Sequence, residues 1–171
     1  MKLNNNYLNK TQIFIIGNLQ SGGAQAALLT QANTLKRINP SLNIFFISAA
    51  PTLTPLRIPA DSLIECIILP VLISSNPFSI IKYFFLLLIK LRKISSIYKD
   101  ISLTYTTPLA SIISSFCCFL LNLKNTNYRI GGLLVSPGFG YLKKFLGYII
   151  ELFALGLSKN LTFVSNQNMI F

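Results

Sequence analysis

The glycines of FIIGNLQSGGAQAALLT (residues 14–30) are the residues of this chain best suited to bind a phosphate. Gly22 and Gly23 stand between an apolar run and an Ala/Leu-rich segment, where a strand would pass into a helix. Free backbone N–H groups and the helix dipole attract an anion at such a turn, and glycine lets the anion come close to the backbone. We therefore predict a phosphate-binding turn, with a tight turn that binds nothing as the alternative.

Two well-known phosphate loops do not fit these glycines. Gly17 and Gly22 have the spacing of a P-loop, but Gly23 and Ala24 stand where a P-loop needs Lys and Ser or Thr. The dinucleotide fingerprint G-x-G-x-x-G is absent as well. A bare Gly-Gly turn remains, and its backbone alone would hold the anion.

The chain offers little for acid–base chemistry. It has no histidine, and its acidic residues are Asp61, Glu65, Asp100 and Glu151. We expect Asp61 and Glu65, four residues apart, to be a solvated pair rather than a catalytic one. Proton transfer needs a positioned group of suitable pKa, and no nucleophile–base pair can be built without histidine. We therefore assign no catalytic residue and expect no turnover from the chain alone.

The three cysteines, Cys66, Cys117 and Cys118, form no CxxC motif. Adjacent thiols in an apolar stretch are typical of buried free cysteines. Zinc-type clusters are not expected in a chain without histidine. We expect a reduced, cytoplasmic protein that contains no metal and no cofactor.

The charge and the hydropathy of the chain limit the classes of binding partner that we expect. The 171 residues are 52% hydrophobic, with 15 Lys and Arg against 4 Asp and Glu, which gives a net charge of +11. This balance favours an anionic partner: a phosphorylated substrate, an anionic lipid surface or a nucleic acid. No nucleic-acid motif is present, so we expect no nucleic-acid partner. The alternative is that the charge only keeps an apolar domain in solution.

Two stretches mix lysines with large apolar residues. Lys82, Lys90 and Lys93 would share one sector of a helix, and Lys143 and Lys144 precede further aromatic and aliphatic residues. Such a mixture suits an anionic bilayer surface, on which lysine stems lie along apolar neighbours. The alternative is an ordinary core helix whose lysines reach water.

A membrane-spanning helix is not expected. The longest uncharged segment, residues 101–123, is rich in Ser and Thr, and Pro108 divides it. Because the residue before a proline is pushed to extended geometry, a strand, a turn and a buried helix describe this segment better.

Apolar β-branched runs alternate with longer helical patterns along the chain. The predicted strands are Gln12–Gly17, Leu42–Ser48, Ile64–Leu69, Asp100–Tyr105, Tyr128–Val135 and Leu161–Val164. The predicted helices are Ala24–Arg37, Phe78–Tyr98, Leu109–Leu123 and Tyr141–Leu157. This alternation predicts an α/β fold in one domain over residues 1–171, a Rossmann-like parallel sheet with helices on both faces. Ligands of such sheets bind at the carboxyl ends of the strands.

Four stretches resemble, in order, the N-terminal domain of the family 4 glycosyltransferases of GT-B fold. They are IFIIGNLQSGGAQAALLTQANTLKR, DISLTYTTPLASIIS, LLVSPGFGYL and LSKNLTFVSNQNMIF, within residues 11–171. The resemblance lies in the order and spacing of the motifs. It implies a single GT-B N-terminal lobe, the acceptor-side half of an enzyme that moves a sugar from a nucleotide-sugar donor to an acceptor such as a lipid-linked glycan.

The resemblance implies two sets of contacts. The donor diphosphate would rest on the turn at Gly22, Gly23 and Ala24. The acceptor side would be lined by Thr107, Pro108, Ser136, Gly138 and Tyr141.

The chain also departs from the family pattern. The C-terminal donor-binding domain is absent from these residues, so we expect a lobe cut or split from it, which binds a nucleotide sugar only with a complementary domain. Many family members carry histidine where Tyr105 or Thr106 and Pro137 stand here. By resemblance the lobe is expected in the cytoplasm, with the inner face of the cytoplasmic membrane as a candidate attachment. The alternatives are a non-enzymatic remnant, a peripheral membrane-binding module and a small integral membrane protein.

Overall fold

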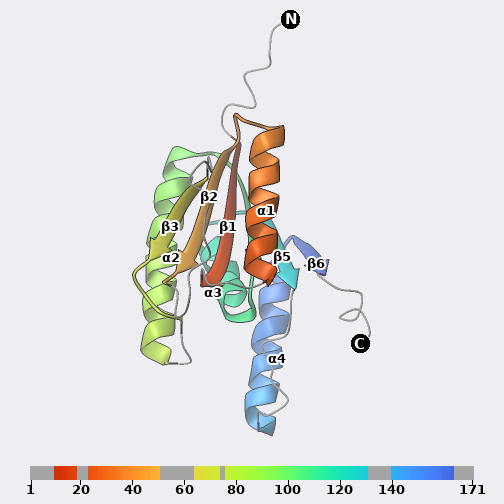
Figure 1. The fold of residues 1–171 in the computed structure, drawn as a ribbon. Coiled ribbons are helices and arrows are strands. Elements are labelled where there is room, and N and C mark those ends of the chain that lie inside the picture. Colours follow the sequence, from red (N-terminus) through yellow and green to blue (C-terminus); the bar gives the residue numbers. More distant parts are fainter. Residues whose placement is uncertain (1–9, 19–22, 51–63, 74–75, 131–139, 164–171) are drawn as a thin grey trace, which may run out of the picture.

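The computed structural model describes residues 10–18, 23–50, 64–73, 76–130 and 140–163. They form a six-stranded sheet with helices on both faces (Figure 1). The elements in chain order are β1 (Lys10–Asn18), α1 (Gly23–Ile38), β2 (Asn43–Ala49), β3 (Glu65–Leu69), α2 (Pro77–Ile97), β4 (Asp100–Thr106), α3 (Pro108–Leu120), β5 (Asn125–Ile130), α4 (Tyr141–Gly156) and β6 (Asn160–Phe163).

All five strand pairings are parallel, and the strand order is β3-β2-β1-β4-β5-β6. The chain builds outward from β1 in one direction, then returns through α2 and continues from β4 in the other. This is the strand order of a Rossmann-type sheet, and β1 and β4 flank its topological switch point. The predicted α/β Rossmann-like architecture is confirmed.

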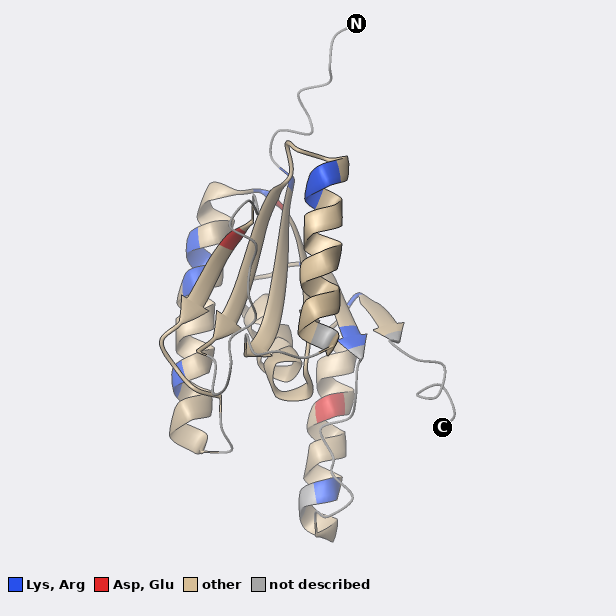
Figure 2. Cartoon of the chain, in the orientation of Figure 1, with Lys and Arg blue, Asp and Glu red and all other residues tan. Residues whose placement is uncertain are grey.

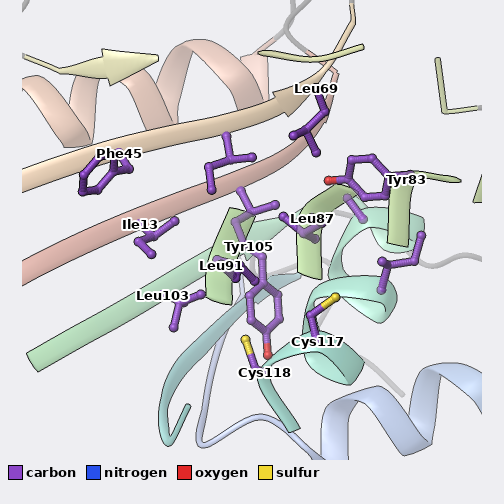
Figure 3. Close-up of a cluster of buried hydrophobic side chains, with 14 of the residues drawn as sticks. Ile13, Phe45, Leu69, Tyr83, Leu87, Leu91, Leu103, Tyr105, Cys117 and Cys118 are labelled. Carbon is purple, nitrogen blue, oxygen red and sulfur yellow. The ribbon is translucent and has the colours of Figure 1, made fainter. Parts of the chain in front are cut away.

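The central strands are buried on both faces, which is why they read as unbroken apolar runs. Along β1, Ile13 and Ile15 belong to one core cluster, and Phe14 and Ile16 belong to the other. Helix α1 packs over the second cluster through Leu28, Leu29 and Ala32. Helices α2 and α3 supply much of the first and larger cluster (Figure 3), and α4 packs beside α3.

A polar network lies between the sheet and helices α3 and α4. The Tyr105 and Ser158 hydroxyls are 2.6 Å apart, and the Ser115 hydroxyl donates to Tyr105 at 3.1 Å. Close by, the Tyr128 hydroxyl donates to a carboxylate oxygen of Glu151 at 3.5 Å. Glu151, only 3% exposed, thus sits inside the fold rather than on the surface of α4.

On the α1 side, the half of the sheet formed by β4, β5 and β6 carries polar side chains, which are buried at Thr104 and Thr106 and exposed toward β6. Hydrogen bonds join neighbouring strands across this face: Gln12 to Thr104 at 3.2 Å, and Thr162 to Asn127 at 3.0 Å. Asn125 also donates to Ser102. We call this surface the open sheet face.

Two predicted boundaries differ from the structure by three residues, and the other described boundaries differ by two residues or fewer. Strand β5 begins at Asn125 rather than Tyr128, because Asn125 already pairs with Ser102 of β4, a pairing that an apolar pattern does not reveal. Helix α3 ends at Leu120 rather than Leu123, because Asn122 takes a positive φ of 53°, a conformation that ends a helix. The predicted end of the fifth strand, residues 131–135, lies outside the described residues.

Among the described residues, no helix is long and apolar enough to cross a membrane. The uncharged segment 101–123 is indeed a strand, a short turn and a helix, as its proline predicted.

Candidate functional site

The carboxyl ends of β1 and β4 lie side by side at the switch point, and helices α1 and α3 both begin at this edge of the sheet (Figure 1). In open α/β sheets this is where a crevice for a ligand forms. The predicted phosphate turn follows β1, and the predicted acceptor residues Thr107 and Pro108 follow β4. The topology therefore brings Gly23 and Ala24 to the same edge as Thr107 and Pro108.

Gly17 sits in a bulge near the end of β1. The register with β2 shifts between Ile16 and Asn18, so Gly17 is the extra residue that β2 does not match. Its N–H donates to Thr107 Oγ1 at 3.0 Å, across 90 residues of sequence. Bulges re-aim the chain and are frequent beside functional sites, and this one ties the end of β1 to the loop after β4.

Only glycine fits at this junction. A Cβ on Gly17 would lie 2.8 Å from Thr107 Oγ1 and 3.8 Å from the Cβ of Ala110 in α3. The first distance is too short for a non-bonded contact, so a side chain would push β1 and α3 apart. The missing side chain of Gly17 is thus what lets the end of β1 approach Thr107.

Thr107 has an unusual backbone conformation, with φ 74° and ψ 128°. A positive φ is rare for a β-branched residue, and such strain is kept only where the surrounding structure enforces it, commonly at functional sites. Thr107 is also the N-cap of α3, yet its side chain makes no capping bond. Its hydroxyl oxygen faces Gly17 instead, which leaves the first N–H groups of α3 without that cap.

The electrostatics of this edge favour an anion. Helices α1 and α3 point their N-termini, the positive ends of their dipoles, at the switch point, and neither has an acidic residue in its first turn. Two of the described carboxylates, Glu65 and Asp100, are the first residues of β3 and β4 and so lie at the opposite edge. Glu151, on α4, faces the interior of the fold and is buried there. The described part of the carboxyl edge therefore carries no carboxylate that could repel a phosphate.

The same distribution limits the chemistry. None of the described carboxylates lies where it could act as a general base at the switch point, and the chain has no histidine. No group of three or more metal-ligating side chains occurs among the described residues. The arrangement suits an anionic ligand electrostatically, but the described residues supply no proton acceptor at this edge.

The predicted site residues fall into three groups. Gly23 and Ala24 open helix α1, and Gly23 is exposed, with open space where a side chain would be. Thr107 and Pro108 form the junction between β4 and α3. Tyr141 is the first residue of α4, is 95% exposed, and lies at the tip of the helix that projects past the strand ends (Figure 1). The remaining predicted residues lie outside the described residues: Gly22, Ser136 and Gly138.

Gly17 is the residue of the candidate site that sequence reasoning missed. The sequence analysis weighed it only as the first glycine of a P-loop spacing. The available signal was a glycine at the end of an otherwise continuous β-branched run, which indicates a bulge or a close backbone approach. Its partner, 90 residues away, leaves no local trace in the sequence.

The sequence matches no known protein family, and no curated protein matches it. Among solved structures, the chain is similar to a UGT transferase from Siraitia grosvenorii in complex with UDP. The TM-score is 0.45 at 15% sequence identity, and the alignment covers 71% of this chain and 27% of that one. The chain thus spans about a quarter of the length of that structure. At this level of similarity neither an activity nor a ligand carries over.

Proposed function

We propose that the chain is the acceptor-side lobe of a glycosyltransferase of GT-B type, which moves a sugar from a nucleotide-sugar donor to an acceptor. The single observation that carries the proposal is the Gly17–Thr107 junction at the switch point. It joins the end of β1, the strand that precedes the predicted diphosphate turn, to Thr107, which the sequence resemblance pairs with the acceptor.

Each loop would have its own task. The free amides at the start of α1, around Gly23 and Ala24, would hold the donor diphosphate and stabilise the charge on the leaving group. Thr107 and Pro108 would position the acceptor on the other side of the junction. Because the described residues provide no general base at this edge, the proton acceptor and the donor nucleotide pocket would come from a complementary second lobe.

A direct test is to titrate the isotope-labelled chain with a panel of nucleotide sugars and follow the backbone amides by NMR. The expected result is weak binding, with the largest shift changes at Gly17, Gly23 and Thr107. Shift changes confined to the opposite edge of the sheet would contradict the proposal. The absence of any shift change at millimolar nucleotide sugar would contradict it as well.

The substitution Gly23→Ala separates binding from folding. A Cβ at Gly23 meets nothing within 4 Å, so the fold should keep its stability or gain about 0.5 kcal/mol from the less flexible unfolded chain. The same Cβ would hinder a phosphate from approaching the amides, so we expect nucleotide-sugar binding to fall at least about tenfold. The matched control is Gly156→Ala, also in open space, at the far end of α4. Equal binding by both variants would exclude the α1 turn as the diphosphate site.

A further inference from the structure

Helix α2 has two apolar faces, and only one of them is used by the fold. The inner face packs into the larger core cluster through Tyr83, Leu87, Leu91 and Ile94, all buried. The helix starts at a well-formed cap, in which the Asn76 side chain accepts a hydrogen bond from the Phe78 N–H at 3.0 Å. This anchoring fixes which residues of α2 face outward.

The outer face of α2 carries a stripe of large apolar side chains at helical spacing. Phe78 is 80% exposed and Ile89 is 64% exposed, with Ile81 and Phe85 between them, each more than half exposed. Residues spaced three and four apart lie on one face of a helix. Contiguous exposed apolar surface of this kind marks an interaction site rather than an ordinary surface.

The stripe continues onto the neighbouring edge strand, β3. A groove of about 280 Å³ runs between the two elements. Its lining includes Ile68, Leu86, Ile89, Lys90 and Lys93. Ile68 is half exposed, so the apolar surface spans both α2 and the edge of the sheet.

The charges on α2 all have one sign. Lys82, Arg92 and Lys93 are exposed beside the apolar stripe, and Lys90 lines the groove. None of the 21 residues of α2 is acidic. Figure 2 shows this basic series along the outer helix of the sheet.

The geometry points to a docking surface for an anionic lipid bilayer, formed by the outer face of α2 and the adjoining edge of β3. An interfacial helix of this kind lies in the membrane plane, with aromatic and aliphatic side chains inserted and lysines on lipid headgroups. The cores of protein–protein interfaces are instead depleted in lysine. The surface does not depend on sugar transfer, so it would hold even if the proposed function failed.

Helix α4 provides the contrast that makes the assignment specific. Its outer face is also apolar, with Leu142, Phe145, Ile149 and Leu152 exposed. The described lysine side chain of α4, Lys144, is half-buried, whereas Lys82, Arg92 and Lys93 of α2 are exposed. The described part of α4 thus offers less exposed positive charge for anionic lipid than α2 does, so α4 serves as the internal control.

The test uses the full chain and vesicles of phosphatidylcholine, with or without phosphatidylglycerol, in a flotation assay. We expect binding only with phosphatidylglycerol and its loss at high salt, because each basic residue near an anionic surface is worth about fivefold in affinity. The variant F85Q/I89Q and the variant K82Q/R92Q/K93Q should each bind at least about tenfold more weakly. The matched controls, F145Q/I149Q on α4 and R37Q/K124Q/K159Q away from α2, should bind as the parent does.

A second readout does not require a weakened variant. The chain contains no tryptophan, so Phe85→Trp and Phe145→Trp are single reporters on α2 and α4. Brominated lipids in the vesicles should quench the fluorescence of the first and leave the second unchanged. The proposal would be overturned if only the Phe145→Trp reporter were quenched, or if the chain bound equally well without phosphatidylglycerol. It would also be overturned if the bound chain resisted a carbonate wash or if no binding were seen.

Discussion

Gly17 and Thr107 define the candidate site: Gly17 leaves space where a side chain would be, and Thr107 adopts a backbone conformation with a positive φ. Gly17 has no side chain, so Thr107 Oγ1 can reach its N–H at 3.0 Å. Thr107 has a positive φ, and a backbone conformation of this kind typically costs about 1–3 kcal/mol. The flexible glycine at the end of β1 and the strained threonine after β4 both reduce the stability of the folded chain.

The substitution Gly17→Ala tests this junction. The new Cβ would lie 2.8 Å from Thr107 Oγ1, so we expect a loss of about 1–3 kcal/mol in the free energy of unfolding, measured by urea denaturation. The substitution Gly140→Ala, where a Cβ meets nothing, is the control and should change little. Adding Thr107→Ala to Gly17→Ala removes the clashing oxygen and should recover part of the loss; strictly additive effects would refute the contact.

At the scale of an element, helix α3 shows how burial sets the chemistry of a side chain. Cys117 and Cys118 face the core, where burial raises the pKa of Cys117 to about 12 and also raises the pKa of Cys118. Cys66 on β3 is half-buried, and its pKa is raised as well. These thiols are therefore packing residues, as their apolar neighbours in the sequence predicted.

The raised thiol pKa values predict how stability depends on pH. The folded chain holds these protons more tightly than the unfolded chain, in which thiols lose them near pH 8.5. The thiol contribution to stability should thus be constant below about pH 8 and fall as the pH rises toward 12, by roughly 2 kcal/mol per buried thiol at pH 10. Urea denaturation across this range measures the trend. In the double variant C117A/C118A the alkaline fall should shrink; an unchanged slope would assign it to other groups.

The elements themselves could be predicted because their patterns are local. The run Ile13–Ile16 predicted a strand buried on both sides, and the Ala/Leu spacing after Gly23 predicted α1, with Lys36 near its end. Lys36 does close that helix, by donating to the Pro40 and Leu42 carbonyls at 2.9 and 2.7 Å. Boundaries failed where the deciding contact was not local, as at Asn125 on β5.

The candidate site was predictable only in part, for a related reason. Thr107 and Pro108 could be named from the motif that contains them, and the switch point explains why ligands would come to them. The strained backbone of Thr107 and its bond to Gly17 arise from tertiary structure, and no propensity encodes them. The remaining predicted contacts, such as Ser136, stay predictions because they lie outside the described residues.

At the scale of the whole molecule, the sheet order makes the two candidate loops neighbours although 90 residues separate Gly17 from Thr107. Strand β1 pairs on both sides, with β2 and β4, and both of its faces are buried. Strands β3 and β6 are the edges. The site thus rests on the most deeply embedded part of the fold, while the proposed lipid surface lies at one edge.

This architecture predicts the order of amide hydrogen exchange. Amides of β1 and β4 should exchange slowest, because they open only when the sheet comes apart, and those of β6 should exchange fastest among the strands. Mass spectrometry of peptic fragments after timed exposure to heavy water gives the ranking. Faster exchange in β1 than in β6 would contradict the central position of the switch point.

The outer part of the open sheet face, on β6, is accessible to solvent. Thr162 is exposed there, on a strand that the larger core does not need. With the buried Cys117 and Cys118 unreactive and Cys66 replaced by serine, a cysteine at position 162 would be the one thiol open to a nitroxide spin label. Pulsed electron-spin measurements from that label to one on a candidate companion polypeptide would follow the approach of the two in solution.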